Sequence, residues 1–249
     1  MNETIQVLMN RKSVRVFEDK EITPEIKDII LAAAMRAPTG GNCMPYSIID
    51  VTDQSIKDKL AETCDHQPFI AQAKMVLIFC ADYHRWYRKF KMAGCEDIPA
   101  PELSNMVLAT EDAVIAAHTA CIAADSLGIG SCYIGDIMEH CELHRELFQL
   151  PPYVFPAVML VLGYPTARQR ERTKPARCPL DSIVMENTYR KMDRDALYQM
   201  FSHKSGQQSY EDWMSAFCNR KYNSDFSREM GRSVREYLKE FLSSDQTEQ

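Results

Sequence analysis

A chain of 249 residues, 45% hydrophobic and 26% charged, has the composition of a globular protein with one large domain or two small ones. Its 29 Lys and Arg against 35 Asp and Glu give a net charge of −6, which argues against general nucleic-acid binding. An anion site must therefore be a local group of cations. The first residues lack a signal-peptide core, and we identify no apolar run near the roughly 20 residues of a membrane span. These features predict a cytoplasmic protein without membrane contact.

The cysteines are scattered along the chain, and none forms a Cys-x-x-Cys pair with another. An odd number of scattered cysteines without a secretion signal indicates reduced thiols rather than disulfides. The spacing of zinc ligands is also missing, so we expect no metal site. The nine positions are Cys43, Cys64, Cys80, Cys95, Cys121, Cys132, Cys141, Cys178 and Cys218.

A short helix is predicted over residues 3–9, followed by the cationic run Arg11-Lys12-Ser13-Val14-Arg15. Side chains of an extended segment alternate between two faces, so Arg11, Ser13 and Arg15 share one face and Lys12 lies on the other. Guanidinium groups bind phosphate oxygens through paired, charge-assisted hydrogen bonds. The run therefore predicts a phosphate site; the alternative is a basic turn that is only solvated.

The next helix begins at Thr23-Pro24-Glu25, which has a capping hydroxyl, a proline in the first turn and an early acid. It ends before Pro38. Residues 37–42 (Ala-Pro-Thr-Gly-Gly-Asn) form a loop in which the glycines allow close approach to a ligand. Thr39 and Asn42 can hydrogen-bond that ligand. An ordinary connection from helix to strand is the other interpretation.

Apolar patterns predict the remaining elements up to residue 163. We expect strands over residues 46–51, 75–81, 128–135 and 157–162, and helices over 53–63, 83–92, 103–127 and 139–149. The aromatic side chains of 83–92 favour packing over a cofactor contact. Helix 103–127 is expected to be the central core helix, with His118 a core or interface histidine. Its predicted buried stripe is Val107, Val114, Ala117, Cys121 and Ala124.

Two cationic groups and a helical extension follow. Residues 168–177 form a second positive patch, mostly a solvated loop, of which one or two members can close on the same anion as Arg11 and Arg15. Helices over 194–203, 209–218 and 226–242 predict an extension, residues 194–249, on a main domain of residues 1–193. Five apolar side chains of this extension are expected to pack on the main domain: Tyr210, Trp213, Met214, Phe217 and Phe241. Five cations form a stripe that is either solvated or contacts a ligand: Arg220, Lys221, Arg228, Arg232 and Arg235.

These motifs together resemble the FMN-dependent nitroreductase family, specifically its branch of larger NADPH-preferring nitroreductases and flavin reductases. The resemblance extends from the N-terminus to about residue 200. It is carried by the cationic run, by residues 37–42, and by Gly128-x-Gly130 leading to Tyr133-Ile134-Gly135. Residues 174–180 (Lys-Pro-Ala-Arg-Cys-Pro-Leu) and 186–189 (Glu-Asn-Thr-Tyr) extend it. Each motif is weak alone, but their order over this length makes chance agreement improbable.

The resemblance implies an α+β fold with a central mixed β-sheet flanked by helices, and a homodimer that binds FMN between its subunits. NADPH or NADH would be the co-substrate. The Arg11 face would hold the phosphate, Gln67 the isoalloxazine edge, and the Ile134–Gly135 backbone would lie by flavin N5. Met44 stands where many relatives have glutamine. The implied cofactor-binding residues are Arg11, Lys12, Ser13, Arg15, Pro38, Thr39, Asn42, Gln67, Tyr133, Ile134, Gly135, Lys174 and Arg177.

The implied activity is reduction of nitroaromatics, quinones or free flavins by ping-pong hydride transfer. Because flavin N5 carries the chemistry, no catalytic side chain is required, and we find no convincing triad or carboxylate pair. Two alternatives remain open. One is other flavin chemistry on the same fold, of the oxidase, dehalogenase or flavin-cleaving type. The other is a redox-silent module that binds FMN or a protein partner.

Overall fold

The computed structural model describes residues 1–242, and the contacts within it divide the chain into two units. The first contains Met1–Arg172 and the chain from Glu229 onward, and the second is Thr173–Arg228. The boundary expected from the sequence lay between residues 193 and 194. The contacts instead end the first unit at Arg172 and return the last helix to it, because side chains of that helix are buried in the first unit's core.

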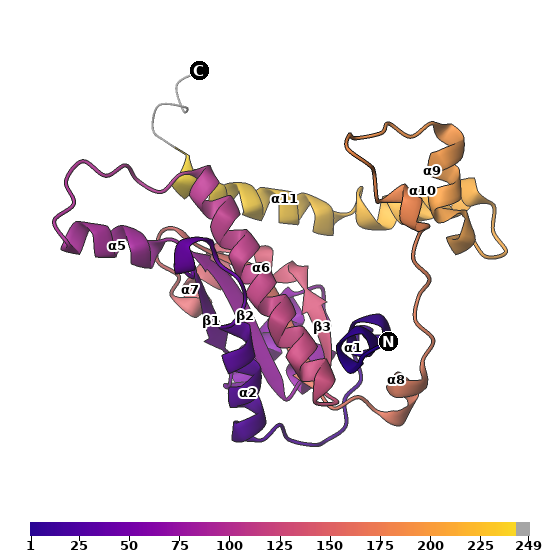
Figure 1. Cartoon of the computed structure of the whole chain (residues 1–249), viewed down its shortest axis with the longest axis horizontal. Helices are drawn as coiled ribbons and strands as arrows, with labels where there is room; N and C mark the ends of the chain where they lie inside the picture. The colour runs from indigo at the N-terminus through magenta and orange to yellow at the C-terminus, as the bar shows by residue number, and fades with distance from the viewer. Residues whose placement is uncertain (243–249) are drawn as a thin grey trace. The chain divides into compact units, whose positions relative to one another are not determined.

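A four-stranded sheet organises the first unit (Figure 1). Its strands are β1 (Tyr46–Asp50), β2 (Met75–Asp82), β3 (Gly130–Ile134) and β4 (Val154–Gly163), in the order β1-β2-β4-β3. All three neighbouring pairs are antiparallel, and a single parallel bridge joins Ser13 to Ser131. The expected α+β fold with a central sheet is confirmed, with the mixed character confined in the described residues to that bridge.

The predicted helices lie close to their expected positions. The helices of the first unit are α1 (Glu3–Asn10), α2 (Pro24–Ala34), α3 (Gln54–Thr63), α4 (Phe69–Gln72), α5 (His84–Met92), α6 (Leu103–Ser126), α7 (Cys141–Phe148) and α8 (Ala167–Glu171). Of these, α4 and α8 were not predicted, and most of α8 lies where a loop was expected. Short 3₁₀ turns occur at Gly40–Asn42, Gly135–Met138 and Lys239–Phe241. The second unit contains Leu180–Ser182 and Ser202–Lys204 as 3₁₀ turns, with helices α9 (Arg194–Phe201) and α10 (Tyr210–Lys221). Helix α11 (Asp225–Leu238) begins in the second unit and ends in the first.

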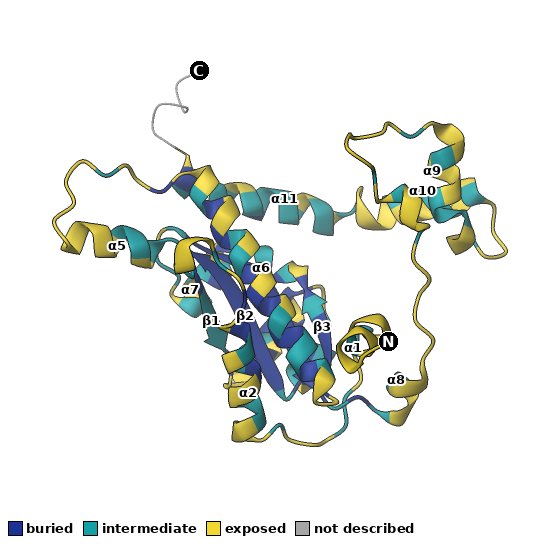
Figure 2. Ribbon diagram, in the orientation of Figure 1, coloured by how far each residue is buried: buried dark blue, intermediate teal, exposed yellow. Residues whose placement is uncertain are grey.

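Both faces of the sheet are covered, as the unbroken apolar run of β2 requires (Figure 2). Alternate side chains of β2 enter two separate clusters. Leu77 and Phe79 pack in the cluster that contains α2 and α6, whereas Val76 and Ile78 pack in the cluster that contains α3 and α4. The core therefore consists of two layers of helices with the sheet between them.

Helix α6 packs on the sheet through small side chains. Its buried residues are Met106, Ala109, Ala113, Ala116, Ala117, Ala120, Cys121 and Ala124. The predicted stripe was right for Ala117, Cys121 and Ala124 and wrong for Val107 and Val114, which are 50% and 42% exposed. The helix is apolar on both sides, so hydrophobicity alone did not identify the side that faces the sheet.

The same helix corrects the expectation about membrane spans. By length and composition, Leu103–Ser126 is apolar enough to cross a bilayer, with a mean hydropathy of 1.4. We had identified no such segment. The alanine side of α6 packs in the sheet cluster, so in this fold it is a core helix, and a core helix passes the same test of length and composition.

Aromatic side chains near the C-terminus divide between the units. Phe241 is buried in the first unit, with its ring centre 5.4 Å from that of Tyr153, so its predicted packing on the main domain is confirmed. Tyr210, Trp213 and Phe217 instead contact one another in the second unit, with neighbouring rings 5.5–6.2 Å apart. These three form a small aromatic cluster of their own.

Two glycines allow the cationic run to lie against the sheet. Gly130 of β3 and Gly163 of β4 are partners in the strand register. A Cβ atom at Gly130 would come within 2.5 Å of Val14, and one at Gly163 within 2.7 Å of the Phe17 ring. Contacts this close do not occur between real atoms, so both positions require glycine for Val14 and Phe17 to pack here.

We expect Gly163→Ala to lower the free energy of unfolding by about 1–3 kcal/mol, because the added methyl group overlaps Phe17 in a packed region. Urea unfolding followed by circular dichroism measures this. Gly40→Ala is the matched control, since a Cβ atom there meets nothing within 4 Å. Equal unfolding midpoints for the two variants would contradict the packing argument.

Candidate functional site

The cationic run is extended and is held to the sheet by backbone hydrogen bonds. Val14 N–H donates to the Ser131 carbonyl at 2.8 Å, and Glu18 N–H donates to the Tyr164 carbonyl at 2.7 Å. Val14 is buried on the side of the run that faces Gly130. The backbone is therefore fixed at both ends, which gives the side chains between them a defined direction.

Arg11, Ser13 and Arg15 share a face, as the alternation predicts. All three lie close enough to the buried Cys132 thiol to lower its pKa, although burial raises that pKa by more. The Arg11 guanidinium is 3.9 Å from the Cys121 sulfur, and that of Arg15 lies 5.9 Å from the centre of the Phe69 ring. The expected common face is thus confirmed by their shared neighbour.

The positive charge of this face is not neutralised within residues 1–242. Neither Arg11 nor Arg15 forms an ion pair with a described carboxylate. Asp125 is an acid whose pKa responds to Arg11. Burial raises the pKa of Asp125 to about 6, and the positive charge of Arg11 opposes that rise. Two guanidiniums beside a hydroxyl, without a paired carboxylate, can accept a phosphate.

Lys12 points to the other side. Its ammonium donates to the carbonyls of Arg170 and Arg172, the latter at 2.7 Å, and the Arg172 guanidinium donates back to the Ser13 carbonyl at 2.6 Å. These bonds fasten the turn after α8 to the cationic run. The geometry therefore gives Lys12 a structural role and separates it from the three residues of the phosphate face.

Gln67 is held by its amide hydrogens. Its Nε2 donates to the Cys64 carbonyl at 2.9 Å and to the Asp136 carboxylate at 2.5 Å. An amide nitrogen has two hydrogens, so both are used and only the amide oxygen remains to accept a hydrogen bond from a ligand. Gly135 is exposed beside Asp136 and begins a 3₁₀ turn, where backbone N–H groups lack partners within the turn.

The same turn holds a buried acid. Glu139 is 4% exposed, and burial together with Asp136, Asp65 and Glu229 raises its pKa to about 7. Its backbone N–H donates to the Asp136 carbonyl at 3.0 Å. Around neutral pH this carboxyl exists in both charge states, so the electrostatic potential at the Gln67 end of the site depends on pH.

Tyr133 and Ile134 present different groups. The Ile134 side chain is buried in the core, so only its backbone can face a ligand. The Tyr133 hydroxyl lies 3.3 Å from His118 Nδ1, and the two rings are stacked. His118 is exposed, so it is not the core histidine that we considered.

The loop of residues 37–42 contacts a different part of α6. The Thr39 hydroxyl donates to the Asp112 carboxylate at 2.6 Å and accepts from the Met44 N–H at 2.9 Å. Pro38 is exposed, and Gly41 and Asn42 have φ of 58° and 55°, the left-handed region that favours glycine. The loop is therefore held in a defined conformation, and its contact with a ligand stays a prediction.

Within one chain the loop and the phosphate face do not meet. Thr39 contacts α6 at Asp112, whereas Arg11 contacts it at Cys121. Nine residues of α-helix separate these points, a rise of about 13 Å. The structure brings together Arg11, Ser13 and Arg15, and separately Gln67 and Gly135 through Asp136, but leaves the loop as a second partial site.

The remaining predicted cations lie elsewhere. Lys174 and Arg177 are exposed in the second unit, so their contact with phosphate stays a prediction. Arg232 donates to both carboxylate oxygens of Glu142 at 2.8 Å and also to Glu229. The ligand-contact interpretation of the stripe is therefore wrong for Arg232, which binds protein carboxylates. Residues 1–242 contain no group of three or more His, Cys, Asp or Glu arranged to hold a metal.

Sequence reasoning missed the acids that position the predicted residues. Asp112 and Asp136 lie 73 and 69 positions from Thr39 and Gln67. No spacing rule links residues that far apart, and only the packing of α6 and of the Gly135 turn brings them together. A carboxylate directly after the motif Tyr133-Ile134-Gly135 was the one local signal available for Asp136.

Comparisons with known proteins identify the family of this chain. The model of the nitroreductase family matches residues 8–164. The FMN reductase [NAD(P)H] of Bacillus subtilis is 33% identical over 240 residues, covering 95% of this chain and 91% of the relative. The oxygen-insensitive NADPH nitroreductase of Salmonella typhimurium is 32% identical and covers 79% of each chain.

A solved structure also matches over nearly the whole length. The NADPH:FMN oxidoreductase of Vibrio harveyi, complexed with NAD+, has a TM-score of 0.75 at 26% identity and covers 98% of this chain and all of its own. The fold, the motif order and the sequence identity lead to one conclusion. The chain belongs to the nitroreductase family.

Proposed function

We propose that this protein is an FMN-dependent NAD(P)H oxidoreductase that reduces nitroaromatics, quinones or free flavins. The observation that carries this proposal is the phosphate face. Arg11 and Arg15 present two guanidiniums beside Ser13, with no ion-pair partner among the described carboxylates. A phosphate monoester carries a charge of roughly −1.5 to −2 near neutral pH, and such an anion fits that face.

The second group of residues fits the ring of FMN. The Gln67 amide oxygen is the free acceptor of its side chain and suits a ring N–H donor. Asp136 holds Gln67 in that orientation. The Gly135 N–H, at the start of the 3₁₀ turn, suits a ring atom that accepts a hydrogen bond. We also assign Tyr133 and the Ile134 backbone to this end of the site.

When bound, FMN supplies the hydride-transfer chemistry. The protein's own contribution is binding and orientation. Arg11, Ser13 and Arg15 hold the phosphate, and Asp136 fixes the amide of Gln67. The chain needs no side chain that acts as an acid or a nucleophile, because neither electron donor nor acceptor is bonded to the protein.

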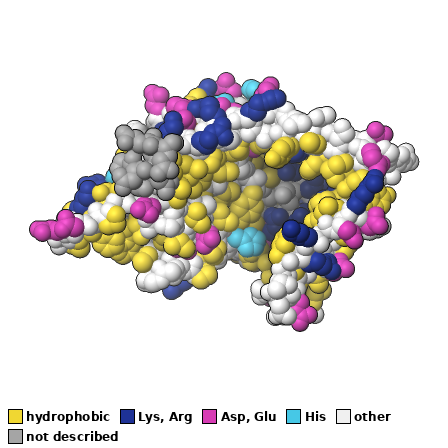
Figure 3. Space-filling view, turned by 90° about the horizontal axis from the view of Figure 1, so that it is seen from above, with side chains coloured by type: hydrophobic (Ala, Val, Ile, Leu, Met, Phe, Trp, Pro, Cys, Tyr) yellow, Lys and Arg dark blue, Asp and Glu magenta, His cyan; other side chains and the backbone are white. Residues whose placement is uncertain are grey.

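We propose a homodimer that completes the site. Thr39 contacts α6 at Asp112, about 13 Å along the helix from the contact of Arg11 at Cys121. A second copy would therefore supply Thr39 and Asn42 to the phosphate face. Helix α6 exposes apolar side chains on the side away from the sheet. Figure 3 shows hydrophobic side chains gathered on one face of the chain. An apolar surface of this kind marks an interface. It consists of Leu103, Val107, Leu108, Val114 and Ile115.

The other proposals follow from the sequence. The nine cysteines are free thiols, which supports a reducing cytoplasmic location. The small-molecule acceptor and the choice between NADPH and NADH are proposed from the family. Lys174 and Arg177 are proposed as further phosphate contacts, and Pro38 as part of the partner's loop.

The purified protein should show a flavin band near roughly 450 nm that bleaches when NADPH or NADH is added without oxygen. Anaerobic visible spectroscopy measures this, and the faster donor identifies the preferred nicotinamide. A flavin band that neither donor bleaches would favour other flavin chemistry on the same fold. A protein that stays colourless after incubation with FMN would contradict the phosphate face.

Arg15→Ala should weaken FMN binding by about tenfold or more, because it removes a charge-assisted hydrogen bond to the phosphate. Fluorescence titration of the apoprotein with FMN measures the dissociation constant. Lys20→Ala is the matched control, since its ammonium lies over the Tyr164 ring at 3.9 Å. Equal affinities of the two variants would remove Arg15 from the site.

A further inference from the structure

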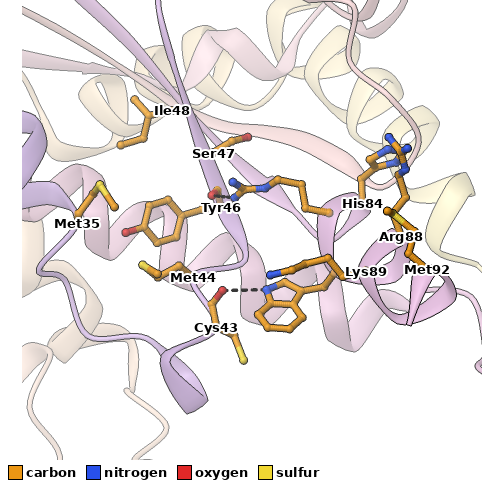
Figure 4. A pocket seen from close by; sticks show the side chains of 12 residues that line it. Met35, Cys43, Met44, Tyr46, Ser47, Ile48, His84, Arg88, Lys89 and Met92 are labelled. Carbon is orange, nitrogen blue, oxygen red and sulfur yellow. Dashed lines mark hydrogen bonds between the residues drawn. The ribbon is translucent and has the colours of Figure 1, made fainter. Parts of the chain in front are cut away.

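The α5 pocket, a cavity of about 810 Å³ between α5, β1 and the loop before β1, is lined by none of the residues implied to bind FMN (Figure 4). Its Trp86 indole donates to the Cys43 carbonyl at 2.8 Å, and the Lys89 ammonium lies over the same ring at 4.6 Å from its centre. The protein's own groups already cover this ring. The feature that bears on the candidate site is instead a buried acid beside Gln67.

That acid is Glu139, which is 4% exposed. Within residues 1–242 its carboxyl group forms no ion pair. Burial without a counter-charge disfavours the ionised form of a carboxyl group. This position therefore suits a neutral carboxylic acid better than a carboxylate.

A 3₁₀ turn connects Glu139 to the residue that holds Gln67. The turn covers Gly135–Met138, and the Glu139 N–H closes it by donating to the Asp136 carbonyl at 3.0 Å. Side chains three positions apart in such a turn lie above one another. The Asp136 carboxylate accepts from Gln67 Nε2 at 2.5 Å. The acid that orients Gln67 and the buried acid therefore belong to the same turn of the chain.

The charges that act on Glu139 are negative and come from three segments. Burial, followed by Asp136, Asp65 and Glu229, raises the pKa of Glu139 to about 7. Asp65 lies directly after α3, Asp136 in the turn, and Glu229 in α11. Each of them makes a second negative charge at this position more costly.

The nearby cations of α11 and α7 are engaged by other groups. Arg232 donates to both carboxylate oxygens of Glu142 and to Glu229, all at 2.8 Å. The His140 ring also faces Glu229, with Nδ1 at 3.8 Å from its carboxylate. These contacts neutralise Glu142 and Glu229, and they leave Glu139 without a counter-charge from either side chain.

His144 of α7 does not supply one either. Its ring nitrogens lie 3.0 Å from the Thr63 hydroxyl and 2.9 Å from the Ile137 carbonyl, so both are occupied by neutral partners. Burial lowers the pKa of His144, which keeps the ring uncharged near neutral pH.

We propose that Glu139 is a positioning residue that is protonated when FMN occupies the site, and that its neutral carboxyl group keeps Asp136 and Gln67 in their binding orientation. This role rests on the proposed function. A flavin ring at Gln67 removes water from the turn, and FMN also adds a phosphate charge of roughly −1.5 to −2. Both effects favour the uncharged form of Glu139. FMN binding is therefore coupled to the uptake of one proton from solvent by the Glu139 carboxylate.

FMN affinity should fall as the pH rises through about 7, because the free protein then holds Glu139 increasingly as the carboxylate. Well below that pH the carboxyl group is already protonated, and binding takes up no proton there. We expect the dissociation constant to rise about fivefold between about pH 6.5 and about pH 8.5.

Isothermal titration calorimetry of the FMN-free protein with FMN measures this coupling. Titrations at about pH 7.5 in two buffers of different ionisation enthalpy should give an uptake of about half a proton for the natural chain. Glu139→Gln, which imitates the neutral carboxyl group, should take up none. Glu146→Gln is the matched control, because Glu146 is an exposed acid of α7, and it should keep the uptake. The FMN phosphate contributes equally in all three proteins.

Asp136→Asn tests whether Glu139 acts through Asp136. At about pH 8.5, Glu139→Gln should tighten FMN binding about fivefold in the natural chain, because it removes the charge that opposes Asp136. In the Asp136→Asn chain the same change should have no such effect, since the two residues are coupled. A tightening that persists in the Asp136→Asn chain would overturn the positioning role.

Equal proton uptake by the natural chain and Glu139→Gln, or no uptake by either, would also overturn the proposal. If the natural chain binds no FMN, the proposed function fails, and urea unfolding tests Glu139 separately. A raised pKa makes this carboxyl group destabilising as the pH rises from 4.5, the ordinary value for glutamate, through about 7. Glu139→Gln should therefore raise the unfolding midpoint at about pH 8 and leave it unchanged at about pH 4. Equal midpoints at the higher pH would remove Glu139 from this role.

Discussion

The close contact of helix α6 with the sheet is the constraint on which the rest of the first unit depends. Six alanines and a cysteine on its buried side let the helix axis approach the strands, where larger side chains would hold it away. That position also fixes the two acids, Asp112 and Asp125, that contact the candidate site. Core packing and site geometry are therefore set by the same helix.

Local sequence patterns predicted most elements of this fold. The buried run of β2 and the Thr23-Pro24-Glu25 start of α2 depend on interactions within a few residues. A local sequence pattern is therefore enough to predict both elements. The orientation of α6 is different, because Val107 and Val114 are as apolar as the residues that face the sheet. Only small side-chain size distinguishes the packed side, and an apolar periodicity does not measure size.

The features of the candidate site were likewise predictable only where they depend on neighbouring residues. Alternation along an extended segment placed Arg11, Ser13 and Arg15 on one face and Lys12 on the other, because that rule involves only neighbouring residues. The resemblance nevertheless implied that Lys12 also binds the cofactor. The bond between Gln67 and Asp136 and the α5 pocket depend on contacts between distant segments. Trp86 illustrates the limit: its helical spacing correctly indicated packing, but a fixed aromatic ring can also form a wall of a cavity.

The separation of Thr39 and Arg11 along α6 has a genetic consequence. In the proposed dimer each active centre takes its phosphate face from one polypeptide and its loop from the other. A subunit damaged at Arg15 and a subunit damaged at Thr39 are then each defective as homodimers. Their mixed dimer contains one centre with both lesions and one centre with neither. The mixed dimer would retain about half of the activity, as two-fold symmetry requires. With random assortment of two co-expressed alleles about half of the dimers are mixed, so roughly a quarter of the total activity would return, the signature of intragenic complementation.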